Sequence, residues 1–121
     1  MRLLKMKVLL VDDEKKFATM LAKRLGLRGI DIDYVYTGED AIVKAGTQKY
    51  DVAILDVKMP GIGGIELERK LKELDPCLKT IFLTGHGSTT DFEAGSAEAT
   101  CYLAKPIQID ELITILREVA G

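Results

Sequence analysis

Two patterns of hydrophobic and polar residues alternate along this chain. Short, mostly apolar runs occur at residues 8–11, 52–55 and 80–83, and a charged residue precedes each of them. Runs of this length without alternation are typical of strands that are buried on both faces. Between the runs, apolar residues recur every three or four positions, which is the spacing of a helix with one buried side. The pattern therefore predicts strands and helices in regular alternation.

Two further strands and four helices complete the predicted order. Residues 30–36 begin with alternating apolar and polar positions, as expected of a half-exposed edge strand, and residues 99–103 form the fifth strand. The helices are marked by these residues: Phe17, Leu21 and Leu25; Thr37 to about Ala45; Ile65, Leu67, Leu71 and Leu74; Leu112, Ile113, Leu116 and Val119. Another helix is expected between the fourth and fifth strands.

Local signals fix several helix ends. Gly26 or Gly29 can end the first helix, Thr37-x-x-Asp40 resembles a capping box, and Pro76 stops the third helix. The third helix also contains two acid–lysine pairs at i, i+4 spacing, which we expect on its solvent side: Glu66 with Lys70, and Glu68 with Lys72.

Five strand–helix units predict an α/β fold with a parallel sheet covered by helices on both faces. Right-handed crossovers and the weak second strand favour the doubly wound, flavodoxin-like strand order 2-1-3-4-5, with strand two at an edge. A chain of 121 residues is the usual size of one domain, so we expect residues 1–121 to form one. Such sheets bind ligands at the carboxyl ends of their strands.

Composition narrows the function classes. The net charge is −2, from 17 basic and 19 acidic residues, so no charge excess favours nucleic-acid binding or a membrane surface. The apolar run near the start is too short for a signal peptide and meets acids at once. Cys77 and Cys101 are far apart in sequence and there is a single histidine, which argues against a zinc site and favours reduced thiols in the cytoplasm.

Polar residues with complementary chemistry stand at four strand ends: Asp12 and Asp13, Asp56, Thr84 and Lys105. Each alone is an ordinary turn, cap or strand exit, but all converge at the ligand-binding edge. Three carboxylates at one edge repel each other unless a cation shares them, and Mg²⁺ suits a few carboxylates with water and phosphate. A hydroxyl and an ammonium beside them complete an electrostatic clamp for phosphoryl transfer to a carboxylate nucleophile.

Four motifs in this order resemble the receiver domains of two-component response regulators, over essentially the whole chain. They are VLLVDDE (residues 8–14), DVAILDVKMPGIGG (51–64), IFLTGHG (81–87) and CYLAKP (101–106). The resemblance implies that Asp56 is the phospho-acceptor. It also implies that Asp12, Asp13 and Asp56 bind Mg²⁺ together with the backbone carbonyl of Lys58.

The same resemblance assigns the switch residues. Thr84 corresponds to the switch hydroxyl, Lys105 to the phosphate-binding lysine, and Tyr102 to the aromatic residue that turns inward on activation. Lys105-Pro106 corresponds to the family's cis-proline turn. The implied partners are a sensor histidine kinase or a phosphotransfer protein, with a possible homodimer through helix 4, strand 5 and helix 5. Self-catalysed phosphoryl acceptance and hydrolysis is the only reaction implied.

Three features depart from the common family pattern. Gly63 stands where many members carry Asp before the third helix, and glycine is an acceptable N-cap. Lys58 and His86 occupy variable positions that tune the lifetime of the phosphate. Between residues 88 and 98 Phe92 is the only large apolar residue and Gly95 weakens a helix, so we expect a short or frayed helix that orders on activation.

Other functions fit the sequence less well. A degenerate receiver that only docks usually lacks the acceptor or the lysine, and both are present. An aspartyl-nucleophile phosphatase of the haloacid-dehalogenase type needs a DxD pattern and a cap insertion, and this chain has adjacent acids and no room for a cap. A flavodoxin-like cofactor binder needs a glycine- or hydroxyl-rich phosphate loop after strand one, which is missing.

Overall fold

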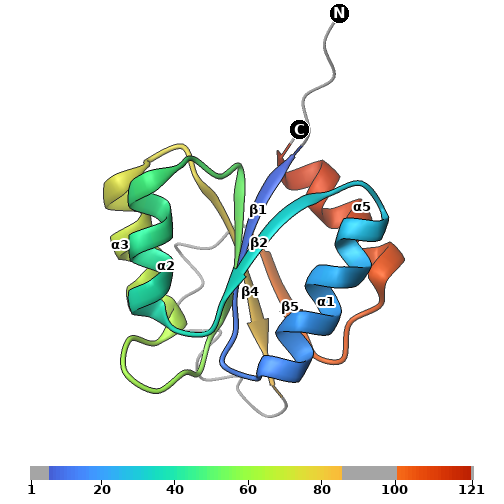
Figure 1. The fold of residues 1–121 in the computed structure, drawn as a ribbon, viewed down its shortest axis with the longest axis horizontal. Coiled ribbons are helices and arrows are strands. Elements are labelled where there is room, and N and C mark those ends of the chain that lie inside the picture. Colours follow the sequence, from blue (N-terminus) through green and yellow to red (C-terminus); the bar gives the residue numbers. More distant parts are fainter. Residues whose placement is uncertain (1–5, 86–100, 121) are drawn as a thin grey trace, which may run out of the picture.

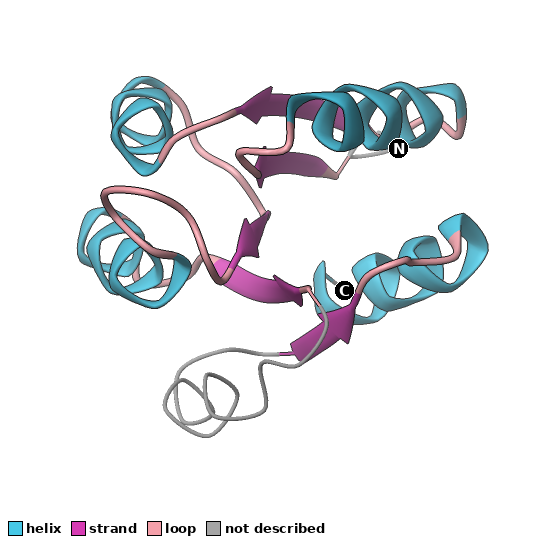
Figure 2. Ribbon diagram, turned by 90° about the horizontal axis from the view of Figure 1, so that it is seen from below, coloured by secondary structure: helices cyan, strands magenta, loops and turns pink. Residues whose placement is uncertain are grey.

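A computed structural model of the protein describes residues 6–85 and 101–120. The expected helix between residues 88 and 98, His86 and the first two residues of the predicted fifth strand lie outside this part of the chain. A central sheet has α1 and α5 on one side and α2 and α3 on the other (Figure 1). The view from below shows helices on both sides of a twisted sheet (Figure 2).

The sheet is parallel, with five strands in the order β2-β1-β3-β4-β5. The strands are β1 (Lys7–Val11), β2 (Asp31–Val35), β3 (Val52–Asp56), β4 (Lys79–Thr84) and β5 (Cys101–Ala104). The predicted fold class and strand order are thereby confirmed, with β2 at one edge. The apolar runs at residues 8–11 and 52–55 lie in β1 and β3, the two strands at the switch point.

Four helices pack on this sheet in the described residues: α1 (Lys15–Leu27), α2 (Gly38–Thr47), α3 (Gly64–Leu74) and α5 (Ile109–Ala120). Alternate residues of β1 serve the two layers, because successive side chains of a strand point to opposite faces. Val8 and Leu10 pack with α1 and α5, whereas Leu9 and Val11 pack with α2 and α3. Among the described helices, none has the length and apolar character needed to cross a membrane.

Two predicted helix ends are confirmed in detail. Gly29 has φ +86° and donates its N–H to the Gly26 carbonyl at 3.0 Å, while the Ile30 N–H bonds to the Leu25 carbonyl at 3.2 Å. These two hydrogen bonds form the Schellman motif, which favours glycine at the residue with left-handed backbone conformation. At the start of α2, the Thr37 hydroxyl accepts from the Asp40 N–H at 3.1 Å. Sequence patterns thus locate the chain reversals on both sides of β2.

One prediction for α3 is wrong. Glu68 does not lie on the solvent side, because its side chain is fully buried against β4. Its carboxylate accepts from the Thr80 hydroxyl at 3.4 Å and pairs with Lys72 at 3.3 Å. The predicted i, i+4 pair with Lys72 is present, but Glu68 occupies the same helical stripe as Leu67 and Leu71. Glu66 remains on the exposed side, 4.0 Å from Lys70.

Candidate functional site

The sheet brings the predicted site residues to one edge. Val11 of β1 is paired with Leu55 of β3, so the next residues along these strands, Asp12 and Asp56, are neighbours. Thr84 is the last residue of β4, and the Lys105 N–H donates to its carbonyl at 2.8 Å. The ends of β1, β3 and β5 therefore supply one carboxyl-end cluster, which we define as Asp12, Asp13, Asp56 and Lys105, and Thr84 lies beside it at the end of β4.

The three acids of this cluster are close enough to share a cation. One carboxylate oxygen from each of Asp12, Asp13 and Asp56 lies within 4.8 Å of the others. Asp12 and Asp56 are buried, with 0% and 5% of their surface exposed, whereas Asp13 is exposed. Oxygen ligands on two buried residues and one exposed residue suit a hard divalent cation that keeps part of its water shell.

Burial and crowding disfavour the ionised form of the central acid. Loss of hydration raises the pKa of Asp56 to about 8, and the negative charge of Asp12 adds to the rise while Lys105 opposes it. One lysine therefore does not compensate the acids around it. A divalent cation among the three carboxylates would favour the ionised form of Asp56.

Lys105 lies closer to two other acids than to Asp56. Its Nζ is 2.7 Å from Asp12 Oδ2 and 2.5 Å from Glu14 Oε1, but 3.8 Å from Asp56 Oδ2. Burial lowers the pKa of Lys105, but hydrogen bonds to Asp12 and Glu14 outweigh burial, so the net shift is upward and the ammonium stays charged. Lys105 thus supplies a permanent positive charge, and a small movement of its side chain would bring this charge into contact with Asp56.

Close packing of α3 fixes the backbone at Asp56. The Val57 N–H donates to the Leu83 carbonyl of β4 at 3.0 Å, and the Gly64 N–H donates to the Val57 carbonyl at 2.9 Å. A Cβ at Gly64 would overlap the Asp56 carbonyl oxygen and lie 2.9 Å from the Val57 Cα. Glycine at this position therefore lets the start of α3 approach the end of β3, and Gly63 serves as the N-cap, as expected.

The remaining predicted residues flank the cluster. Thr84 is buried at the end of β4, paired with Ala104 of β5. The half-buried ring of Tyr102 packs on Phe82, with 5.3 Å between ring centroids. Lys58 is exposed in the loop between β3 and α3, two residues beyond Asp56. The Lys105-Pro106 bond is cis, as the sequence resemblance implies.

Sequence reasoning did not assign a role to two residues that contact the site. Glu14 pairs with Lys105, and the Phe17 ring lies 4.5 Å from the Lys105 Nζ. Both belong to the start of α1, directly after the acid pair. The sequence pattern marks Phe17 only as a core residue of its helix, and Glu14 only as part of a motif. Their position next to Asp12 and Asp13 was the available signal.

Comparison with protein families gives one match that covers most of the chain. The model of the response regulator receiver domain matches residues 8–117. The transcriptional regulatory protein TrcR of Mycobacterium tuberculosis is 35% identical over 112 residues, which cover 92% of this chain and 44% of TrcR. The chain thus spans less than half the length of this curated relative.

Two solved structures are similar over the described fold. The response regulator TrrA from Thermotoga maritima, solved in complex with Mg²⁺-BeF, has a TM-score of 0.84 and 32% identity, covering 94% of this chain and 98% of that one. A response regulator from Burkholderia pseudomallei, solved with a phosphorylated aspartic acid, calcium ion and citrate, has a TM-score of 0.86 and 27% identity. That match covers 96% of this chain and 69% of the Burkholderia chain.

Proposed function

Because the chain belongs to the response regulator receiver domain family, we propose that it is a signalling switch that accepts a phosphoryl group on Asp56. The observation that carries the proposal is the position of this carboxylate. Asp56 is the buried end of β3, it faces Asp12 and Asp13, and a charged lysine lies 3.8 Å away. A carboxylate beside these acids and this lysine can act as the nucleophile in phosphoryl transfer.

In the proposed reaction, a carboxylate oxygen of Asp56 forms a bond to phosphorus while the bond to the donor breaks. Developing negative charge on the phosphoryl oxygens would be stabilised by Lys105 and by the hydroxyl of Thr84. The Lys105 ammonium is a compact charge on a flexible side chain, so it can move to contact a phosphoryl oxygen on Asp56 without a change in the backbone.

Mg²⁺ is the proposed cofactor, held by Asp12, Asp13, Asp56 and the backbone carbonyl of Lys58. The raised pKa of Asp56 and the closeness of the three carboxylates fit a site that is completed by a cation. When bound, the ion would neutralise charge on the phosphoryl oxygens. The similar Thermotoga and Burkholderia regulators were solved with a divalent ion, which supports the same chemistry here.

Signal transmission is proposed to run from Thr84 to Tyr102. A phosphoryl group on Asp56 adds charge beside Thr84 and Lys105, and movement of Thr84 toward it leaves space that the Tyr102 ring can occupy. The strand pair β4 and β5 connects the two residues, since Phe82 is paired with Tyr102 and Thr84 with Ala104. The proposed output face is formed by the fourth helix of the family, β5 and α5, and could also form a homodimer.

The proposed phosphoryl donor is a cytoplasmic sensor histidine kinase or phosphotransfer protein. The curated relatives that resemble this chain are named as transcriptional regulators or response regulators, and a sensor protein is also among them. Phosphoryl acceptance and hydrolysis by the domain itself would then be its only chemistry.

A phosphorylation assay tests the proposal. The protein is incubated with Mg²⁺ and a small acyl phosphate, and the intact mass is measured over time. We expect one added phosphoryl group in the wild type and none in Asp56→Ala. Asp51→Ala is the matched control, because it makes the same change at the residue directly before the same strand, at the opposite end of the sheet. Equal labelling of wild type and Asp56→Ala would refute the acceptor assignment, and no labelling of either would favour a docking module.

A further inference from the structure

Lys105, the lysine of the site, contacts a group of residues at the start of α1. The Lys105 Nζ contacts Glu14 Oε1 at 2.5 Å and Asp12 Oδ2 at 2.7 Å, and it lies 4.5 Å from the centroid of the Phe17 ring. Two carboxylates and an aromatic face are favourable surroundings for an ammonium. Asp56 lies farther away, at 3.8 Å, so the lysine rests on its neighbours rather than on the acceptor.

Within the described part of the chain, Lys105 is the one charged partner of the Glu14 side chain. Glu14 holds the N-cap position of α1, but it makes no capping hydrogen bond, and glutamate is not among the preferred N-cap residues. The backbone N–H of Glu14 donates to Asp12 Oδ1 at 2.9 Å. The carboxylate instead reaches across to the end of β5, 91 positions away in sequence. Helix capping therefore does not explain the residue at this position, whereas the contact with Lys105 does.

We propose that Glu14, supported by Phe17, is a positioning residue that holds Lys105 in a resting location and thereby opposes its transfer to a phosphoryl group on Asp56. The inference rests on the proposed function and adds a control to it. Any interaction that favours the resting location of the lysine alone raises the free energy of the phosphorylated state relative to the resting state. Glu14 thus sets how readily the switch is turned on.

The substitution Glu14→Gln removes the charge and keeps the shape. Glu14 is 63% exposed, so the fold should tolerate the change. Losing one charge-assisted hydrogen bond at an exposed site should make the phosphate mimic bind about threefold to tenfold more tightly. Phe17→Leu, which removes the ring and keeps an apolar side chain, should shift the affinity in the same direction by a smaller factor.

The test is a titration with beryllofluoride at a Mg²⁺ concentration that saturates each variant, followed by NMR of the backbone amides. Glu111→Gln is the matched control, because it removes one exposed acid from the first turn of α5 and leaves Lys105 untouched. We expect tighter binding in Glu14→Gln and wild-type affinity in Glu111→Gln. Unchanged or weaker binding in Glu14→Gln would overturn the inference.

A second comparison shows whether the effect passes through the lysine. In a Lys105→Ala background, Glu14→Gln should change the affinity by less than about twofold, since no ammonium remains to be held. An equal gain in both backgrounds would refute a positioning role and show a direct charge effect. If the wild type bound no beryllofluoride at all, the proposed function would fail, and this outcome is distinct from failure of the Glu14 inference alone.

Discussion

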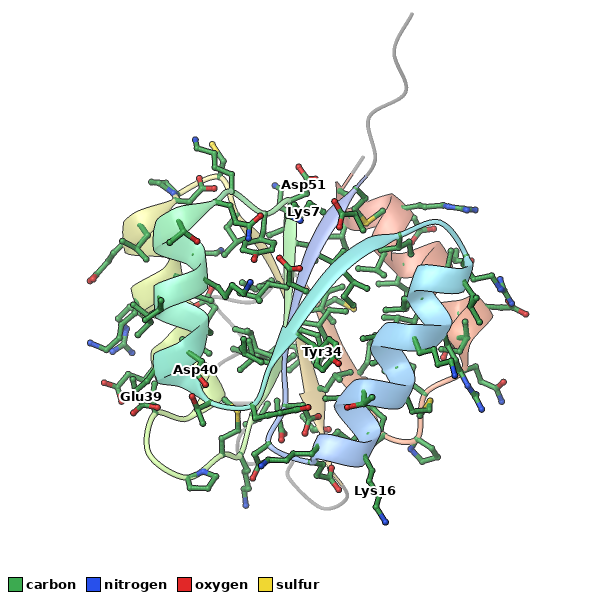
Figure 3. The ribbon with its side chains drawn as sticks, in the orientation of Figure 1. Lys7, Lys16, Tyr34, Glu39, Asp40 and Asp51 are labelled. Carbon is green, nitrogen blue, oxygen red and sulfur yellow. The ribbon has the colours of Figure 1, made fainter. Side chains whose placement is uncertain are left out.

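The two ends of the sheet carry similar residues in opposite electrostatic states. At one end lies the carboxyl-end cluster of Asp12, Asp13, Asp56 and Lys105. At the other lies an amino-end network, defined as Lys7, Asp31, Asp33, Tyr50 and Asp51. Lys7 and Asp51 lie together near one end of the molecule, opposite Lys16 at the start of α1 (Figure 3). Each group combines three acids with one lysine.

Every acid in the amino-end network has a donor. The Lys7 Nζ lies 3.3 Å from Asp31 and 3.6 Å from Asp33, and the Lys7 N–H donates to Asp51 at 2.8 Å. The Tyr50 hydroxyl donates to Asp33 at 2.6 Å. That hydrogen bond, aided by Lys7, outweighs partial burial and holds the pKa of Asp33 below its usual value. This network therefore favours the charged form of Asp33.

The carboxyl-end cluster does the opposite. Its central acid is more deeply buried, and the pKa of Asp56 is raised to about 8 where that of Asp33 is lowered. Both groups contain three acids and one lysine, so the difference comes from burial and from the Tyr50 hydroxyl, a donor that the carboxyl-end cluster lacks. A buried acid whose pKa is raised by its surroundings marks a candidate functional site. An acid whose charge is stabilised by neighbouring donors is more typical of a structural network. Four variants or conditions can break or sharpen this contrast.

The largest effect is expected from Gly64→Ala. A Cβ there would overlap the Asp56 carbonyl oxygen, so α3 or the end of β3 must shift, and we expect a loss of about 3 kcal/mol of unfolding free energy. Gly46→Ala in α2 is the control: its Cβ would meet nothing within 4 Å, and it should gain about 1 kcal/mol of helix stability. Urea unfolding measures both. Equal, small effects would show that α3 does not approach Asp56 as closely as described.

Mg²⁺ should stabilise the protein through the carboxyl-end cluster alone. At a concentration about 100 times its dissociation constant, a ligand of the folded state adds about 2.7 kcal/mol. Asp13→Ala should lose this gain, whereas Asp31→Ala, in the amino-end network, should keep it. Thermal unfolding with and without Mg²⁺ is the measurement. A gain of the same size in Asp13→Ala would place the ion elsewhere.

The pH dependence without Mg²⁺ should differ in sign between the two ends. The pKa of Asp56 is raised, so between about pH 4 and 8 the folded state keeps a proton that the unfolded state has lost, and stability falls as the pH rises. Asp56→Asn removes this loss and should gain about 1–2 kcal/mol at pH 8 relative to wild type. Urea unfolding at pH 5 and pH 8 tests the sign. A wild-type stability that rises across this range, with no gain in Asp56→Asn, would contradict it.

Asp33 should behave in the opposite way, with the smallest effect. Its pKa is lowered, so its contribution is present above the unfolded value and is lost as the pH falls through the folded one. Tyr50→Phe removes the hydroxyl donor and should cost about 1 kcal/mol at neutral pH. The cost should shrink in strong acid, where Asp33 is protonated. A constant cost at all pH values would mean that the hydroxyl, and not its bond to an ionised Asp33, is what matters.

Much of the fold was predictable because its signals are local. Apolar runs mark strands buried on both faces, and Thr37 and Gly29 carry the geometry of their helix ends in their own chemistry. The convergence of Asp12, Asp56 and Lys105 was also predictable, since parallel strands end at one edge of the sheet. Local pattern and topology together were therefore sufficient to identify the carboxyl-end cluster.

Two features could not be read from the sequence. Glu68 fits an exposed ion pair by spacing, and only the packing of α3 against Thr80 shows that it is buried. The contact of Glu14 with Lys105 joins α1 to the end of β5 over 91 positions, so neither residue signals the other locally. In both cases a charged side chain depends on a partner that tertiary packing selects.

Locating the phosphoryl group in the chain identifies the acceptor residue. After phosphorylation with a small acyl phosphate and Mg²⁺, borohydride reduction converts a phosphorylated aspartate to homoserine, and peptide mass spectrometry identifies the position. We expect homoserine at position 56 alone, and none when Mg²⁺ is removed. Homoserine at position 12, 13 or anywhere in the amino-end network, with Asp56 unmodified, would contradict it.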